Sequence, residues 1–248
     1  MSAKDQREAA ARAAHKAQLR RQTPVLRRAA PTREENQVLL ILCQGEVTEV
    51  EYFEHFELAT ATIRAVGQAY DPEKLVQYAL ELREEARQQR QPYEQVWCVF
   101  DKDDTRPGNF QTALDKAAAN GVEAAYSNQA FEFWLLLHFD DHAGGGMSRK
   151  SCGQRLQKLI TAASPRVFYN PVKGKHVSRD LFDLLEANDP SARTSRVSRR
   201  EVAMRRAEAI DRRWEADGTA PSRQESTTRV YRLVQVLQRH LPARPGRE

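Results

Sequence analysis

The 248-residue sequence has no apolar run of about 18 residues, the length needed for a membrane-spanning helix. Its basic N-terminus has no hydrophobic segment of the kind found in secretory signals. The three cysteines, Cys43, Cys98 and Cys152, lack the spacing of a metal-binding motif, and they are too few for a disulfide scaffold. We therefore expect a cytoplasmic protein without a membrane segment.

Motifs that cradle phosphates or activate a serine are absent as well. The sequence contains no GxGxxG, P-loop or GxSxG pattern, which excludes a nucleotide-hydrolysing motor within this chain. A small-molecule phosphotransferase would also lack its phosphate loop. The formal net charge of +5 is a mild basic excess, which permits a polyanionic partner such as nucleic acid.

Most of that excess lies near the N-terminus. Residues 1–30 hold eight Lys or Arg but only two acids, Asp5 and Glu8. We predict that residues 1–36 form a basic arm and linker. Such arms are usually solvated, and contact with nucleic acid is the alternative.

Strand and helix patterns alternate over residues 37–146. The wholly apolar run 38–43 and the run 95–100 are typical of strands buried on both faces of a parallel sheet. Shorter strands are expected at 62–66 and 122–126. Helices are expected at 49–58, 71–89, 110–120 and 131–139. This alternation predicts an α/β core with a parallel sheet and helices on both faces.

Residues 147–248 are richer in Lys and Arg, and their patterns are helical. We predict that they form a basic helical addition packed on the core. The expected helices lie near 149–162, 178–187, 197–217 and 225–240. Within the core, Thr48 and Glu51 have the spacing of a capping box, and Asp71-Pro72 has the pattern of a helix start.

Acidic residues follow two of the predicted core strands. Glu46, Glu49 and Glu51 come after the first, and Asp101, Asp103 and Asp104 after the third. The carboxyl ends of parallel strands share one edge of the sheet, so the two clusters can converge. Oxygen ligands without His or Cys suit Mg²⁺ or Mn²⁺, which would support phosphodiester hydrolysis. The alternative is a solvated acidic turn.

A third cluster lies in residues 127–139. Glu132 sits on an apolar, aromatic helix, where a carboxylate is costly unless it is paired or bound to metal. His138 follows six residues later. A lone histidine on an apolar face is often structural, but the nearby carboxylates leave a functional role equally open.

These stretches, in this order, resemble the RloB family of prokaryotic defence-associated proteins. Residues 44–53 (QGEVTEVEYF) are similar to the family pattern EGxxTExxYF, and residues 99–103 (VFDKD) to its strand followed by DxD. Residues 127–139 (SNQAFEFWLLLHF) match its SNxxFExWLLLHF block almost throughout. Residues 228–234 (TRVYRLV) resemble its final helix.

The resemblance implies a Toprim-like variant of the Rossmann-like fold and Mg²⁺-dependent cleavage of nucleic acid, either DNA or RNA such as tRNA. It also implies an AAA-type ATPase as partner in anti-phage defence. On this hypothesis Asp101 and Asp103 hold the metal, and Glu49 or Glu46 completes the site. Predicted roles for the remaining residues are orientation of water or a second metal by Glu132, proton transfer or phosphate contact by His138, and backbone binding by Lys102, Lys173 and Lys175.

One position departs from the family pattern. The family's glutamate before the glycine is Gln44 here, and an amide has no charge to give a metal and cannot act as a base. Either Glu46 or Glu49 takes its place, or the metal site is weakened. The second hypothesis is therefore a non-catalytic subunit that binds nucleic acid or regulates an ATPase.

Overall fold

The computed structural model describes residues 37–102, 107–142, 145–192 and 197–242. All of them belong to one unit, Asn36–Glu248. The predicted basic arm and linker (1–36) and two of the predicted acids, Asp103 and Asp104, lie outside the described residues.

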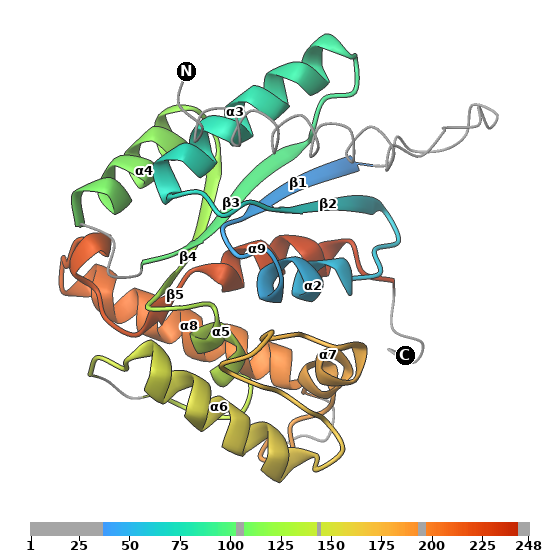
Figure 1. The fold of residues 1–248 in the computed structure, drawn as a ribbon, viewed down its shortest axis with the longest axis vertical. Coiled ribbons are helices and arrows are strands. Elements are labelled where there is room, and N and C mark those ends of the chain that lie inside the picture. Colours follow the sequence, from blue (N-terminus) through green and yellow to red (C-terminus); the bar gives the residue numbers. More distant parts are fainter. Residues whose placement is uncertain (1–36, 103–106, 143–144, 193–196, 243–248) are drawn as a thin grey trace. The chain divides into compact units, whose positions relative to one another are not determined.

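A five-stranded sheet with the order β2-β1-β3-β4-β5 forms the centre of this unit (Figure 1). Four strands run parallel: β1 (Gln37–Cys43), β2 (Ala61–Gly67), β3 (Gln95–Asp101) and β4 (Glu123–Asn128). The short β5 (Thr227–Thr228) pairs antiparallel with β4. The predicted α/β architecture is confirmed, but the helix expected from residue 225 is wrong at its start, because residues 227–228 complete the sheet instead.

Each of the strands β1 to β4 is followed by a helix, and the rest of the chain is mainly helical. The core contains α2 (Thr48–Glu54), α3 (Pro72–Gln88), α4 (Pro107–Ala119) and α5 (Glu132–Leu136). After it come α6 (Arg149–Ala163), α7 (Arg179–Glu186), α8 (Arg199–Ala216), the 3-10 turn η1 (Pro221–Arg223) and α9 (Val230–Arg239). None of the helices in the described residues is long and apolar enough to cross a membrane.

The two central strands, β1 and β3, are almost wholly apolar because the sheet is covered on both faces there. Alternate residues of a strand point to opposite faces, so Phe100 packs on α4, with its ring 5.7 Å from that of Phe110. Trp97 and Val99 join the core cluster on the other face, where α2, α5 and α9 lie (Figure 1). Asp101 continues this second set and so is directed to the side of α2 and α5.

The C-terminal helices belong to the same core. Apolar residues of α6, α7, α8 and α9, including Leu156, Leu181, Ile210 and Leu233, are buried in one cluster with the inner strands. The residues after 146 therefore share the packing of the sheet and also supply its last strand.

Two predicted helix starts have different outcomes. Asp71 caps α3 as predicted, since its side chain accepts the backbone N–H of Lys74 at 3.1 Å and Pro72 is the first helical residue. The predicted capping box at Thr48 and Glu51 is wrong. Thr48 lies inside α2, and both side chains bond to residues of a distant loop instead.

Candidate functional site: an acidic cavity at the carboxyl ends of β1 and β3

A cavity of about 620 Å³ opens where β1 and β3 end. Its lining comes from the turn 44–47, the start of α2, residues 69–71, Asp101, the start of α5, Arg149 of α6, and Val172, Gly174 and Lys175. This is the edge of a parallel sheet at which α/β proteins place their ligands. The cavity is therefore the candidate functional site, and we call it the acidic cavity.

Three buried carboxylates from three different elements line it. Glu49 of α2, Asp101 of β3 and Glu132 of α5 are 6%, 8% and 3% exposed. Burial of a carboxylate costs free energy unless a partner compensates its charge. The convergence of Glu49, Asp101 and Glu132 agrees with where the sequence placed them.

Two of these carboxylates have a cation beside them. Arg149 Nη2 lies 3.0 Å from Asp101 Oδ2, and Lys175 Nζ lies 2.5 Å from Glu132 Oε1. Glu49 forms no ion pair within the part of the chain that the structure describes. The cavity thus combines two neutralised acids with a third, Glu49, whose charge is not directly paired.

The environment of Glu49 changes its acidity. Burial, and secondarily the negative charge of Glu132, raise its pKa from 4.5 to about 7. Its own backbone N–H, Lys175 and Arg149 act in the opposite direction. A carboxyl group with such a pKa exchanges its proton near neutral pH, which is a property of functional sites more than of structural acids.

Two glycines make room for this arrangement. A β-carbon on Gly45 would overlap the Glu49 carboxylate, and one on Gly67 of β2 would stand 2.6 Å from the Cα of Glu46. Gly67 therefore lets the turn after β1 pack against β2, and Gly45 leaves the space that the Glu49 carboxylate fills. Glu46 itself is exposed at the cavity's edge.

Gln44 occupies the position where the family pattern has glutamate. Its side-chain Oε1 accepts the backbone N–H of Asp101 at 2.9 Å. Its backbone N–H donates to Val99 O at 2.8 Å. The amide therefore ties the ends of β1 and β3 together. This contact needs only an oxygen acceptor, which a carboxylate also provides.

A loop from the C-terminal region places Lys175 in the cavity. Thr48 donates its hydroxyl hydrogen to Lys175 O at 2.9 Å, and Glu51 Oε2 accepts the N–H of Val177 at 2.7 Å. Glu51 Oε1 also lies 2.7 Å from His176 Nδ1. The Thr48 and Glu51 pair of α2 thus holds residues 175–177 against the start of that helix.

The other predicted site residues lie apart from the lining. His138 is fully buried, its Nδ1 is 3.0 Å from Trp134 O, and burial lowers its pKa to about 3. Lys102 donates to Gln224 O at 3.3 Å, and Lys173 is exposed on the loop next to Lys175. The structure therefore brings together Glu46, Glu49, Asp101, Glu132 and Lys175, without His138.

Arg149 was not predicted from the sequence. It is the first residue of α6 and is followed by Lys150, although cations are unfavourable at a helix N-terminus. That local conflict was the available signal. Two cations at a helix start indicate that at least one of them interacts outside the helix, and Arg149 does so through its ion pair with Asp101.

The cavity's oxygen donors match a hard divalent cation in type. Among the described residues no group of three or more His, Cys, Asp or Glu forms a ready-made metal site. Mg²⁺, however, is commonly held by one or two carboxylates together with water and substrate phosphate. Glu49, unpaired and buried, and Asp101 at the adjacent strand end provide such a set.

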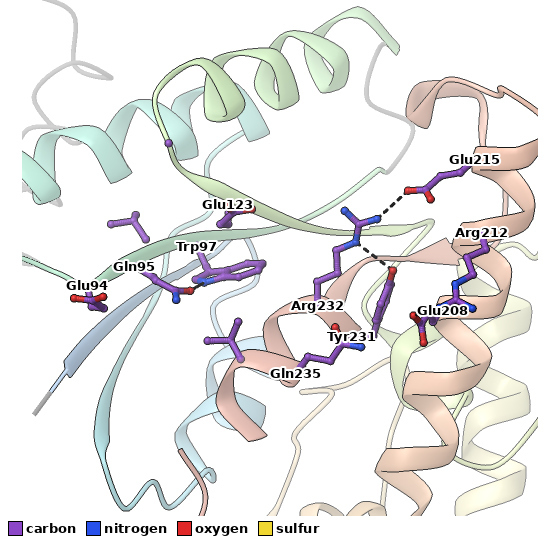
Figure 2. A pocket seen from close by; sticks show the side chains of 13 residues that line it. Glu94, Gln95, Trp97, Glu123, Glu208, Arg212, Glu215, Tyr231, Arg232 and Gln235 are labelled. Carbon is purple, nitrogen blue, oxygen red and sulfur yellow. Dashed lines mark hydrogen bonds and ion pairs between the residues drawn. The ribbon is translucent and has the colours of Figure 1, made fainter. Parts of the chain in front are cut away.

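A second cavity of about 770 Å³ lies near the start of β3, between the sheet and the helices α8 and α9 (Figure 2). Four of its six charged side chains pair with one another: Arg232 contacts Glu215 at 2.9 Å, and Arg212 contacts Glu208 at 2.7 Å. Arg232 also lies 2.7 Å from Asp211, a buried acid at the base of this network. These pairs indicate a structural cleft rather than a reactive centre.

A family model described as RloB-like protein matches residues 39–237, a range that contains the whole acidic cavity. The chain belongs to the RloB-like family. The match covers the turn that carries Gln44 and the strand that carries Asp101, as well as the C-terminal helices. Searches of curated proteins and of solved structures found no match.

Proposed function

We propose that this RloB-like protein is a metal-dependent nuclease of the Toprim type that cleaves phosphodiester bonds of RNA, such as tRNA, or of DNA. One observation carries the proposal: the buried carboxyl of Glu49, with a pKa near 7, shares a cavity with Asp101 at the ends of adjacent parallel strands. Cationic side chains at the same place, Arg149 and Lys175, suit a phosphate group.

In this proposal the chain's residues divide the work. Glu49 and Asp101 would hold Mg²⁺ or Mn²⁺, with Asp103 as a further predicted ligand and Glu46 near the rim. The bound ion would neutralise phosphate oxygens and lower the pKa of a water. Glu132, fixed by Lys175, orients that water.

The cations bind the substrate. Arg149 and Lys175, still beside Asp101 and Glu132, also contact the scissile phosphate, and Lys173 and Lys102 attract the backbone farther out. Proton transfer by His138 is left out of this scheme, because its ring is buried away from the cavity. It stays a prediction from the sequence.

The setting of this activity rests on the family resemblance. We propose a cytoplasmic protein of anti-phage defence that works with an AAA-type ATPase. The absence of a P-loop from the sequence supports a separate ATPase chain as the source of any nucleotide hydrolysis.

Gln44 favours a second candidate, a non-catalytic subunit that binds nucleic acid or regulates the ATPase. Its amide is engaged with the backbone of Asp101 and brings no charge to the cavity. In the same cavity, Asp101 and Glu132 are already neutralised by internal cations. Binding without cleavage is the activity expected of this alternative.

One experiment separates the two. The purified full chain is incubated with end-labelled RNA, tRNA and DNA in Mg²⁺, Mn²⁺ or EDTA. Cleavage that needs the metal and falls at least about 100-fold in Asp101→Asn supports the nuclease, because metal contacts contribute several kcal/mol. Asp141→Asn, an exposed acid outside the cavity, is the control.

Gln44→Glu completes the test. Its carboxylate can keep the bond to the Asp101 N–H while adding a charge, so a nuclease should gain metal affinity. If neither the wild-type chain nor Gln44→Glu cleaves any substrate, but both bind, the nuclease proposal is rejected in favour of the binding subunit.

A further inference from the structure

A long segment beside the acidic cavity contains no acid. From His142 to Arg179 there is no Asp or Glu, although the whole chain has 34, and the segment holds eight Lys or Arg. They are Arg149, Lys150, Arg155, Lys158, Arg166, Lys173, Lys175 and Arg179. We call the continuous described part of it, residues 145–179, the acid-free segment. Its charge is opposite to that of a nucleic-acid backbone.

The segment is built onto the cavity wall. α6 buries Cys152, Leu156 and Ile160 in the core, and the loop 164–178 that follows it returns along the helix. A β-carbon on Gly153 would lie 2.8 Å from Pro171 Cβ, so loop and helix are in close contact. The loop then supplies Val172, Gly174 and Lys175 to the cavity lining.

Several of its cations have no acidic partner. Arg155 pairs with Asp140, and Arg179 pairs with Glu57 and Asp183. Lys150, Lys158, Arg166 and Lys173 are exposed and form no ion pair within the described parts of the chain. Unpaired surface cations bind nucleic acid favourably because their binding releases the counterions that surround its phosphates.

The same loop exposes large apolar side chains. Phe168 is 75% exposed and Val172 is 82% exposed, whereas the neighbouring Tyr169 is buried at 2%. An aromatic face among unpaired cations is the arrangement on which unpaired bases stack in proteins that bind single strands. Bases within a duplex are already stacked and offer no free face.

We propose that the acid-free segment is a binding surface for single-stranded nucleic acid, with Phe168 stacking on an unpaired base. Lys150, Lys158, Arg166 and Lys173 hold the backbone, and Val172 lies where the strand enters the acidic cavity. The proposal deepens the proposed function by naming the strand state of the substrate, and it rests on nucleic acid being the partner.

Binding measured without catalysis tests it. Fluorescence anisotropy of the full chain in EDTA compares a labelled single strand of about 20 nucleotides with its duplex, in RNA and DNA forms. Phe168→Ala should weaken single-strand binding roughly 5- to 150-fold and leave duplex binding nearly unchanged. Phe168→Tyr, which keeps the ring, should bind as the wild type does.

The salt dependence of binding tests the role of the cations separately. Lys173→Gln should reduce the slope of log affinity against log salt by about 0.7 for a single strand. Lys74→Gln, an exposed lysine of α3 that is already paired with Asp71, is the matched control and should leave the slope unchanged. Equal binding by Phe168→Ala and wild type, or equal losses on single strand and duplex, overturns the proposal.

These results are independent of cleavage. If the chain never cleaves but Phe168→Ala loses single-strand binding, the nuclease fails and the surface stands. If metal-dependent cleavage occurs and Phe168→Ala binds normally, the proposed single-strand surface is rejected and the nuclease proposal is kept.

Discussion

The Glu49 carboxylate lies directly over Gly45, in space that any β-carbon at position 45 would fill. Gly45→Ala should therefore displace the carboxylate rather than unfold the chain, because the obstacle is the end of a flexible side chain. We expect metal-dependent cleavage to fall about as far as in Glu49→Gln, with a change in unfolding free energy of about 1 kcal/mol or less.

The double variant Gly45→Ala/Glu49→Gln checks the mechanism of that loss. If Gly45 acts only through Glu49, the double variant should be no worse than Glu49→Gln alone. Additive losses in cleavage assays would show that Gly45 has a separate role.

The raised pKa of Glu49 makes stability depend on pH. In metal-free protein the unfolded chain loses this proton near pH 4.5, whereas the folded chain keeps it to about pH 7. Stability should therefore fall as pH rises between these values, by about 3 kcal/mol. Glu49→Gln removes the penalty and should be more stable than wild type at pH 8, but not at pH 4.

Urea unfolding in EDTA at the two pH values measures this difference. Glu54→Gln, an exposed acid on the same helix, serves as the control for the loss of a carboxylate from α2. The same stability difference between Glu49→Gln and wild type at both pH values would contradict the raised pKa.

The Lys175–Glu132 pair joins the C-terminal loop to α5. Lys175→Met leaves a nearly buried carboxylate without its cation and should cost about 2 kcal/mol of unfolding free energy. Lys175→Met/Glu132→Gln should recover most of that loss, because the stranded charge is gone. Arg179→Met, which breaks only exposed pairs, should cost less than about 0.5 kcal/mol.

Chemical denaturation of the wild type, Lys175→Met, Glu132→Gln and the double variant gives the coupling energy. A coupling near zero would mean that the pair does not link the loop to α5.

His138 predicts a second pH dependence, opposite in direction. Its pKa is about 3 in the fold and 6.5 ordinarily, so below pH 6.5 the unfolded chain binds a proton that the folded chain refuses. As the pH falls from 6.5 to about 3, the free energy of unfolding should decrease by up to about 1.4 kcal/mol per pH unit. His138→Gln should flatten this part of the melting-temperature profile, and His240→Gln, at a less buried site, should not.

The same variant tests the predicted proton transfer. Because His138 lies outside the cavity lining, we expect His138→Gln to retain cleavage. Loss of cleavage with an unchanged fold would restore the catalytic assignment.

Much of the site follows from local sequence patterns. An apolar run that ends in an acid predicts a buried parallel strand with a carboxylate at its carboxyl end, which is where Asp101 lies. The acids after β1 and β3 converge because parallel strands end at one edge, so Glu49 and Asp101 could be placed together before the structure.

The cations of the site could not be placed in this way. Lys175 is 127 residues from Thr48, and no local rule states which loop will pack on α2. The capping pattern at Thr48 and Glu51 was misleading for the same reason, since a tertiary partner competed with the helix end. Such contacts depend on the packing of the entire chain rather than on any short pattern.

The antiparallel strand β5 has a consequence for the order in which the chain is completed. Ser127 of β4 bonds to Thr228 across 101 residues of sequence, so β4 remains an open edge while those residues are being synthesised. Open strand edges pair readily with other chains. A ribosome that stops before Thr228 leaves β4 exposed to pairing with other chains, and the strand beside Asp101 gains its last neighbour only after those 101 residues have been made.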